Sequence, residues 1–166
     1  MGTSKKTDNI SDITDINLSG IRKKRFRIDG DNDRILELNT SDLNILVRLR
    51  EAYPQLVELS NEAFKKWPET TPEDEEVDFM SDPNITATVE LLKETDAKMR
   101  ELIDYIFDSN VSEVCAPNGS MYDPINGKLR YEHIIECMSN LYETNITSEV
   151  KKISKRVEKH TDKYRK

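Results

Sequence analysis

Residues 86–107 read TATVELLKETDAKMRELIDYIF, and this stretch decides the fold class. Apolar residues recur in it at intervals of three and four, which is the spacing of one face of an α-helix. The stripe consists of Val89, Leu92, Met99, Ile103 and Ile106, and Leu91, Leu102 and Phe107 widen it. The sequence therefore predicts a long amphipathic helix. Asp96 falls on the same stripe, either as an acid with a raised pKa or, as we favour, at an exposed edge or in a local ion pair.

Two further helical patterns flank this one. Positions with helical spacing between residues 43 and 67 are Leu43, Leu46, Val47, Arg50, Tyr53, Val57 and Ser60, with Phe64 and Trp67 near the end. Thr40 or Ser41 can cap this helix, and Pro54 predicts a kink or break near residues 52–53, which allows two shorter helices. The last pattern covers residues 128–164. It is apolar at Tyr131, Ile134, Ile135, Met138, Leu141 and Tyr142, then thinner and basic around Ile146, Val150, Ile153 and Val157.

Turn-forming residues separate these helices from two other segments. Residues 25–28 and 35–38 flank Asp-Gly-Asp-Asn-Asp at 29–33, which predicts a short β-hairpin. Residues 108–127 are rich in Asn, Pro and Gly, and we expect an ordered, irregular loop there, anchored by Val111, Val114, Met121 and Tyr122. The predicted fold class is therefore mostly α: a short N-terminal β-hairpin followed by about three amphipathic helices.

The length of 166 residues leaves room for one compact domain plus tails. Residues 1–24 are expected to be a disordered, basic and polar tail. Residues 25–150 are expected to form a single α-rich domain, interrupted at 68–83 by an acidic linker with three Pro and seven acidic residues. Residues 151–166 are expected to be a basic helical extension of that domain.

The net charge of -7 conceals a segregation along the chain. Residues 1–27 carry seven Lys/Arg and three Asp, residues 28–150 carry ten Lys/Arg and 27 acids, and residues 151–166 carry eight Lys/Arg and two acids, so the segments have charges of +4, -17 and +6. An acidic body with basic ends can attract its own tails, pair head-to-tail with copies of itself, or present the ends to a polyanion. Charge alone does not choose among these.

Composition also argues against a membrane or secreted protein. No apolar run approaches the ~18 to 20 residues of a membrane span, and residues 1–24 lack the apolar centre of a secretion signal. We therefore expect a cytoplasmic protein without membrane contact. Cys115 and Cys137 are too few for a disulfide framework and lack zinc-site spacing, so two reduced, partly buried thiols are expected.

Candidate catalytic and metal motifs are weak. Asp29, Asp31 and Asp33 match the first three ligand positions of a calcium loop, but Arg34 stands where a Gly is needed and Thr40 where a bidentate Glu is needed. A plain acidic turn is the favoured interpretation. The two histidines lie 27 residues apart without partner spacing, and no Gly-rich phosphate loop occurs. We expect no enzyme activity, no cofactor and no metal site.

The basic end offers an alternative function in binding a polyanion. Its candidate phosphate-binding residues are Lys151, Lys152, Lys155, Arg156, Lys159 and Lys163. Only one aromatic residue, Tyr164, lies among them, whereas stacking on single-stranded bases normally needs several. A solvated or self-pairing helix is therefore favoured over nucleic-acid binding.

Several short motifs resemble a known family. They are the hairpin from Phe26 to Leu38 with its Ile-Asp-Gly turn, the helix end Leu-Ile-Asp-Tyr-Ile-Phe-Asp at 102–108, and residues 119–124, 130–132 and 141–142. The hairpin, the helices and this helix end resemble the short tail assembly chaperones of long-tailed bacteriophages and prophages. The last three stretches resemble small phage structural-module proteins of Gram-positive hosts. The chaperone family often has an Ile-Phe-Gly step where a helix ends; Asp108 replaces the Gly here, which is a departure.

The resemblance implies a chaperone that coats the tape measure protein during tail assembly and is absent from the finished tail. Aromatic and Met side chains dominate such contact surfaces. The candidate contact residues are Tyr53, Phe64, Trp67, Met80, Phe107, Met121 and Tyr122, with ordinary core packing as the favoured alternative for each. A competing hypothesis is an acidic inhibitor or DNA mimic of a host factor that uses residues 69–82.

Overall fold

The computed structural model describes residues 16, 23–65, 67 and 80–163. Its elements are β1 (Lys24–Arg27), β2 (Ile35–Leu38), α1 (Asn44–Phe64), α2 (Pro83–Phe107), α3 (Val111–Cys115), β3 (Pro124–Ile125), β4 (Lys128–Leu129) and α4 (Arg130–Lys163). The mostly helical fold with an N-terminal hairpin is thus confirmed. The predicted tail at 1–24 lies outside the described residues except at positions 16, 23 and 24, and the predicted linker does so at 68–79.

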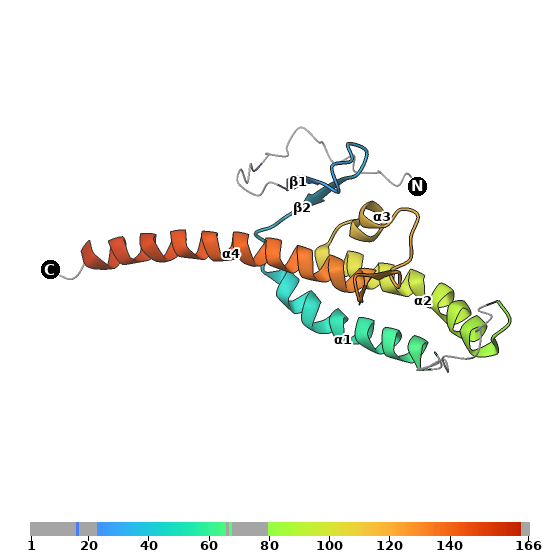
Figure 1. The fold of residues 1–166 in the computed structure, drawn as a ribbon. Helices are drawn as coiled ribbons and strands as arrows, with labels where there is room; N and C mark the ends of the chain where they lie inside the picture. Colours follow the sequence, from blue (N-terminus) through green and yellow to red (C-terminus); the bar gives the residue numbers. More distant parts are fainter. Residues whose placement is uncertain (1–15, 17–22, 66, 68–79, 164–166) are drawn as a thin grey trace, which may run out of the picture.

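Three long helices form the body of the molecule. α1 and α2 run side by side in opposite directions, and the first half of α4 lies along them (Figure 1). The hairpin pairs β1 with β2 in antiparallel register, with Phe26 opposite Leu36. Arg34 fixes the hairpin to α3, because its guanidinium donates to the carbonyls of Val114 at 2.9 Å and Cys115 at 2.8 Å.

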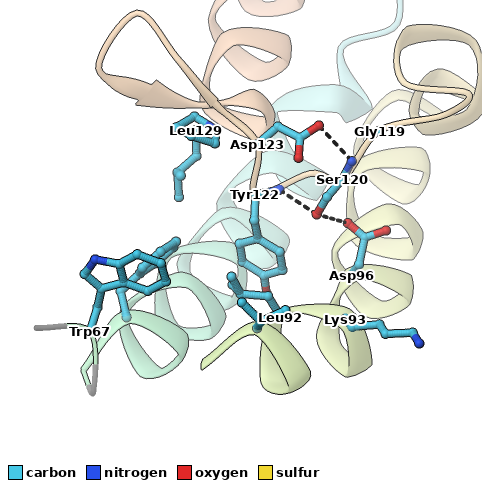
Figure 2. A pocket seen from close by; sticks show the side chains of 12 residues that line it. Trp67, Leu92, Lys93, Asp96, Gly119, Ser120, Tyr122, Asp123 and Leu129 are labelled. Carbon is cyan, nitrogen blue, oxygen red and sulfur yellow. Dashed lines mark hydrogen bonds between the residues drawn. The ribbon is translucent and has the colours of Figure 1, made fainter. Parts of the chain in front are cut away.

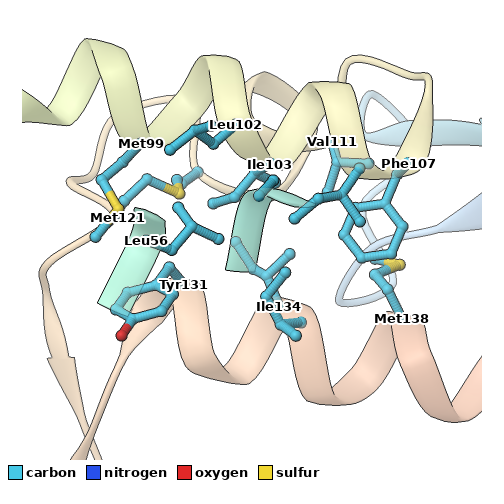
Figure 3. Packing of buried hydrophobic residues seen from close by; sticks show 14 of the residues in the cluster. Leu56, Met99, Leu102, Ile103, Phe107, Val111, Met121, Tyr131, Ile134 and Met138 are labelled. Atoms are coloured by element: carbon cyan, nitrogen blue, oxygen red, sulfur yellow. The ribbon is translucent and has the colours of Figure 1, made fainter. Parts of the chain in front are cut away.

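The core lies where α1, α2 and α4 meet (Figure 3). Its fully buried members come from β2, α1, α2, α3 and the loop after α3: Leu36 and Leu38, Leu56, Met99, Ile103 and Ile106, Val111 and Met121. Tyr131, Ile134 and Met138 of α4 close the core from below in Figure 3. Tyr142 of the same helix is also buried. Burying a side chain of this size stabilises the fold by about 1.5–3 kcal/mol.

Residues at the two ends of α2 determine where this helix begins and ends. The Asp82 carboxylate accepts from the backbone N–H of Asn84 at 2.8 Å and of Ile85 at 3.2 Å, and Pro83 occupies the first turn. The helix therefore begins at Pro83, three residues before the predicted start, and that proline belongs to the helix and not to a linker. At the other end Asp108 takes the left-handed conformation, with φ 49° and ψ 46°.

Replacing Asp108 by glycine is expected to stabilise the protein by about 0.5 kcal/mol. The left-handed conformation costs most L-residues roughly 1–2 kcal/mol, somewhat less for Asp, and glycine avoids it at the expense of a freer unfolded chain. Urea denaturation measures the change. Glu101→Gly, at an exposed interior position of the same helix, should instead destabilise by about 1 kcal/mol. Equal losses in both variants would show that the backbone conformation at Asp108 carries no strain.

Two predictions for α1 are wrong. Neither Thr40 nor Ser41 caps this helix, because its N-cap is Leu43, which makes no side-chain cap hydrogen bond. α1 is continuous from Asn44 to Phe64 with Pro54 inside it, so the chain does not divide into two shorter helices. Both Pro54 and Arg50 are exposed, and water can therefore replace the hydrogen bond that the Arg50 carbonyl loses.

The expected ordered loop at 108–127 is confirmed and contains more regular structure than its composition indicated. It holds α3 and, with residues 128–129, a second small hairpin whose turn residues Asn126 and Gly127 have φ of 50° and 78°. Its expected anchors pack against or within the core, with Val111 and Met121 fully buried.

Candidate functional site

A pocket of about 690 Å³ opens between the end of α1, the first half of α2 and the segment from Gly119 to Leu129 (Figure 2). Its lining is mostly apolar: Phe64, Trp67, Val89, Leu92, Tyr122, Pro124 and Leu129. Lys93, Asp96, Gly119, Ser120 and Asp123 supply its polar part. We call this the aromatic pocket.

Three aromatic rings set the shape of the aromatic pocket. The ring of Phe64 meets Trp67 edge-on with centroids 6.2 Å apart, and meets Tyr122 edge-on at 6.4 Å. Edge-to-face pairs at this separation are favourable and hold the rings in a defined orientation. Figure 2 shows Trp67 and Tyr122 facing the same hollow from different elements.

The Tyr122 hydroxyl is held in place by a hydrogen bond with Thr95. It lies 2.7 Å from Thr95 Oγ1, which itself donates to the Leu91 carbonyl at 2.7 Å, so the tyrosine is the donor of the pair. Burial is the main cause that raises the pKa of Tyr122 above its ordinary value. The phenol therefore stays protonated and rigidly placed.

The loop wall of the pocket is fixed to α2 by one ion pair. Asp96 and Arg100 are four residues apart, and Arg100 Nε donates to Asp96 Oδ2 at 2.7 Å. The other Asp96 oxygen accepts from Ser120 Oγ at 3.0 Å and from the Met121 N–H at 2.7 Å. The Arg100 guanidinium also donates to three loop carbonyls, those of Ser112, Ala116 and Gly119.

This arrangement decides between the two alternatives for Asp96. Burial raises its pKa, but the hydrogen bonds from Arg100, the Met121 backbone and Ser120 outweigh burial, so the pKa of Asp96 lies below its ordinary value. The local ion pair is confirmed, and the raised-pKa acid is wrong.

Gly119 leaves room for an ion pair where the loop turns toward Arg130. A Cβ at this position would lie 2.7 Å from Asp123 Oδ2 and 2.9 Å from Arg130 Nη2. Those two groups form an ion pair at 2.9 Å, and Asp123 also accepts from the Ser120 N–H at 3.0 Å. A larger residue here would therefore require the ends of these two side chains to shift.

The structure brings together three of the seven candidate contact residues. Phe64, Trp67 and Tyr122 are separated by up to 58 positions in the sequence, yet all line the aromatic pocket. Sequence analysis placed Phe64 and Trp67 near the end of one predicted helix and Tyr122 in a distant loop, and gave no indication that they meet.

The other four candidates lie elsewhere. Phe107 is 2% exposed and Met121 fully buried, so core packing, the favoured alternative, describes both, and they do not form a contact surface. Met80 is 89% exposed near the start of α2. Tyr53 is exposed beside a shallower apolar depression of about 400 Å³ that Leu46, Leu49 and Ile135 also line.

Sequence reasoning missed some surface residues because it assigned them to core stripes. Leu43, Leu46 and Val47 of the α1 region and Val89 of α2 are all more than half exposed. The available signal was the width of the stripes, which exceeds what a core of three helices can cover.

The basic candidates lie on the second half of α4. Lys151, Lys152, Lys155, Arg156 and Lys159 are exposed, and Lys163 lies in the last turn of the helix. Lys152 pairs with Glu149 at 2.7 Å on the same helix. The cations from Lys151 to Lys159 thus face solvent along an extended helix and do not converge on a concave site.

The two thiols differ in environment. Both cysteines are free; Cys115 is half-buried beside α2 and Cys137 is exposed on α4, so the expectation of partial burial fits only the first. Burial raises the pKa of the Cys115 thiol to about 11, against a smaller lowering by Arg34.

Within the described ranges, no cluster of three or more His, Cys, Asp or Glu side chains is arranged to hold a metal ion. Among the same residues, no helix combines the length and apolar character needed to cross a membrane. In the acidic turn of the first hairpin, the charge of Asp29 is paired with Arg34, whose Nη1 lies 3.1 Å from Asp29 Oδ2.

No protein-family profile, curated protein or solved structure matches this chain.

Proposed function

We propose that this chain is a non-catalytic binding protein that holds an apolar segment of a partner protein in the aromatic pocket. The observation that carries the proposal is the convergence of Phe64, Trp67 and Tyr122 on one hollow next to Val89 and Leu92. With the family resemblance, the proposed partner is a phage tape measure protein, and the chain acts as a tail assembly chaperone in the host cytoplasm.

Physical chemistry supports an apolar client. Binding energy at protein interfaces concentrates in pockets that receive a few large side chains, and Trp and Tyr are prominent among the residues that supply it. The pocket is wide enough for such side chains, and Lys93 and Asp123 at its polar part can orient the bound backbone. The acidic body, with a charge of -17 over residues 28–150, would keep a complex with an aggregation-prone helix soluble.

The acidic-inhibitor hypothesis predicts a different binding mode. It relies on residues 69–82, most of which lie outside the described residues. Binding through that segment should weaken steeply with salt, whereas binding through an apolar pocket should change little.

Co-expression with a tagged tape measure fragment, followed by pull-down at low and at high salt, tests the proposal. We expect the complex to survive high salt and the fragment to stay soluble only when this protein is present. A complex that dissociates at high salt would support the acidic-inhibitor hypothesis. If no complex forms at either salt concentration, the tape measure protein is not the client.

A substitution at the pocket rim tests the site itself. Val89 is 51% exposed, so Val89→Arg should leave the fold intact while its long cationic side chain covers the hollow. We expect about a tenfold loss of affinity for the client, equivalent to ~1.4 kcal/mol. Fluorescence of Trp67, the single tryptophan, reports the binding.

Val47→Arg is the matched control, because Val47 is a β-branched residue, 55% exposed, on α1 and outside the pocket. It should bind the client as the unmodified chain does. Equal affinities of the Val89 and Val47 variants would exclude the aromatic pocket as the binding site.

A further inference from the structure

The second half of α4 extends beyond the rest of the described fold (Figure 1). Tyr142 is buried at 3% exposure, and Ile146 still packs partly against the core. Every residue from Thr147 to Lys159 is exposed. The helix therefore continues for several turns past its last core contact.

The composition of this end does not favour an isolated helix. Residues 144–157 include Thr144, Asn145, Thr147, Ser148 and Ser154, which are weak helix formers, together with four β-branched apolar residues. Most of the stability of a helix in a protein comes from packing of an amphipathic face and not from intrinsic propensity. Packing along one face would therefore stabilise the helical conformation of this segment.

One face of the segment carries a regular apolar line. Ile146, Val150, Ile153 and Val157 follow one another at intervals of four, three and four, which is the seven-residue repeat of helices that pair along a seam. Val150, Ile153 and Val157 are 49%, 51% and 53% exposed. We call these four residues the α4 seam.

We propose that the α4 seam binds the α4 seam of a second copy of this chain, with the two helices antiparallel. The charge distribution selects both the occupant and the orientation. Residues 151–166 carry +6 and residues 28–150 carry -17, so an antiparallel pair places each basic end beside the acidic body of the other copy. A parallel pair would place two basic ends side by side.

The register of the pair follows from the repeat. In the antiparallel pair Val150 packs against Ile153 of the other copy, and Ile146 packs against Val157. The same register puts Glu149 of each copy opposite Arg156 of the other, beside the seam. A parallel pair would instead place Glu149 near Ser154 and Arg156 near Thr161, which are uncharged.

The geometry leaves room for both bodies. In this register, the Tyr142 residues of the two copies lie 19 positions apart along the paired helices. At about 1.5 Å per residue that separation is roughly 30 Å, close to the diameter of a small domain. The bodies can therefore sit at opposite ends of the seam without overlapping.

Sedimentation equilibrium of the full chain over a range of concentrations tests the proposal. We expect a monomer–dimer equilibrium, and Ile153→Glu should weaken dimerisation at least tenfold, because it places a carboxylate at the centre of the seam. Ser148→Glu adds the same charge at an exposed position on the opposite side of the helix and should dimerise as the unmodified chain does. Since Ile153 is exposed in the monomer, the variant should still fold, which circular dichroism checks.

A charge exchange tests the orientation. Glu149→Arg and Arg156→Glu should each weaken the dimer several-fold, and the variant carrying both changes should recover it. A chain that stays monomeric at every concentration, or an Ile153→Glu variant that still dimerises, would overturn the proposal. Failure of the double variant to recover would overturn the antiparallel arrangement, and a monomer that instead binds a DNA duplex through residues 151–159 would assign this end to a polyanion.

The client-binding proposal is tested separately, because Val89→Arg should leave dimerisation unchanged.

Discussion

Replacing Asp96 by asparagine is expected to lower the free energy of unfolding by about 3 kcal/mol. The Arg100 guanidinium, whose side chain is only 26% exposed, would face an amide in place of a carboxylate. The loop from Ser112 to Met121 would also lose the charged acceptor that holds Ser120 Oγ and the Met121 N–H. We expect Trp67 fluorescence to shift as the loop wall of the aromatic pocket loosens, and urea denaturation gives the stability change.

The effect should depend on pH in one direction. The pKa of Asp96 is lowered in the folded protein, so its carboxylate stabilises the fold above the unfolded-state pKa near 3.8, and this contribution disappears as pH falls through the lower folded-state pKa. The difference between the unmodified chain and Asp96→Asn should thus be full above about pH 5 and shrink below about pH 4. Glu94→Gln, at an exposed position of the same helix, should change stability by less than about 0.5 kcal/mol. A comparable loss in both variants would show that the network adds nothing specific.

Replacing Phe107 by alanine is expected to lower the free energy of unfolding by about 3–5 kcal/mol. The ring is 2% exposed, and its centroid lies 6.0 Å from that of Tyr142, so α4 and the end of α2 would share the resulting cavity. Thermal and urea denaturation both report the loss. Client affinity, measured where the variant is still folded, should be unchanged because Phe107 does not reach the surface.

Tyr105→Ala is the control for that change. Tyr105 lies two residues earlier on α2, is 48% exposed, and donates a hydrogen bond to Glu51 at 2.6 Å. Its loss should cost roughly 1 kcal/mol. If the two variants lost the same stability, the packing assigned to Phe107 would be incorrect.

Local patterns were enough to predict the first hairpin and the three long helical segments, but not α3 or the second small hairpin. The hairpin followed from its Asp-Gly turn, where Asp29 and Gly30 have φ of 51° and 74°, and α2 followed from its apolar stripe. Pro54 misled the prediction of α1, because the sequence does not show that Pro54 and Arg50 are exposed, where water can replace the lost hydrogen bond.

The candidate site could be predicted only in part. Aromatic residue types pointed to Phe64, Trp67 and Tyr122, but their meeting depends on how α1, α2 and the loop pack, which no periodicity encodes. A local ion pair of Asp96 was one of the predicted alternatives, whereas its partner Arg100 and the contacts of both residues with carbonyl and amide groups up to 25 residues away became visible only in the structure.

The unequal environments of the two cysteines give the unmodified chain a single reactive handle. A thiol reagent attacks the thiolate, and a pKa of about 11 in place of the reference 9.0 lowers the thiolate fraction of Cys115 about a hundredfold at neutral pH. Cys137 is exposed on α4, where a reagent can reach it from solvent. A maleimide dye or spin label therefore attaches to α4 without any engineered residue, and it places a spectroscopic reporter on the helix that joins the core to the seam.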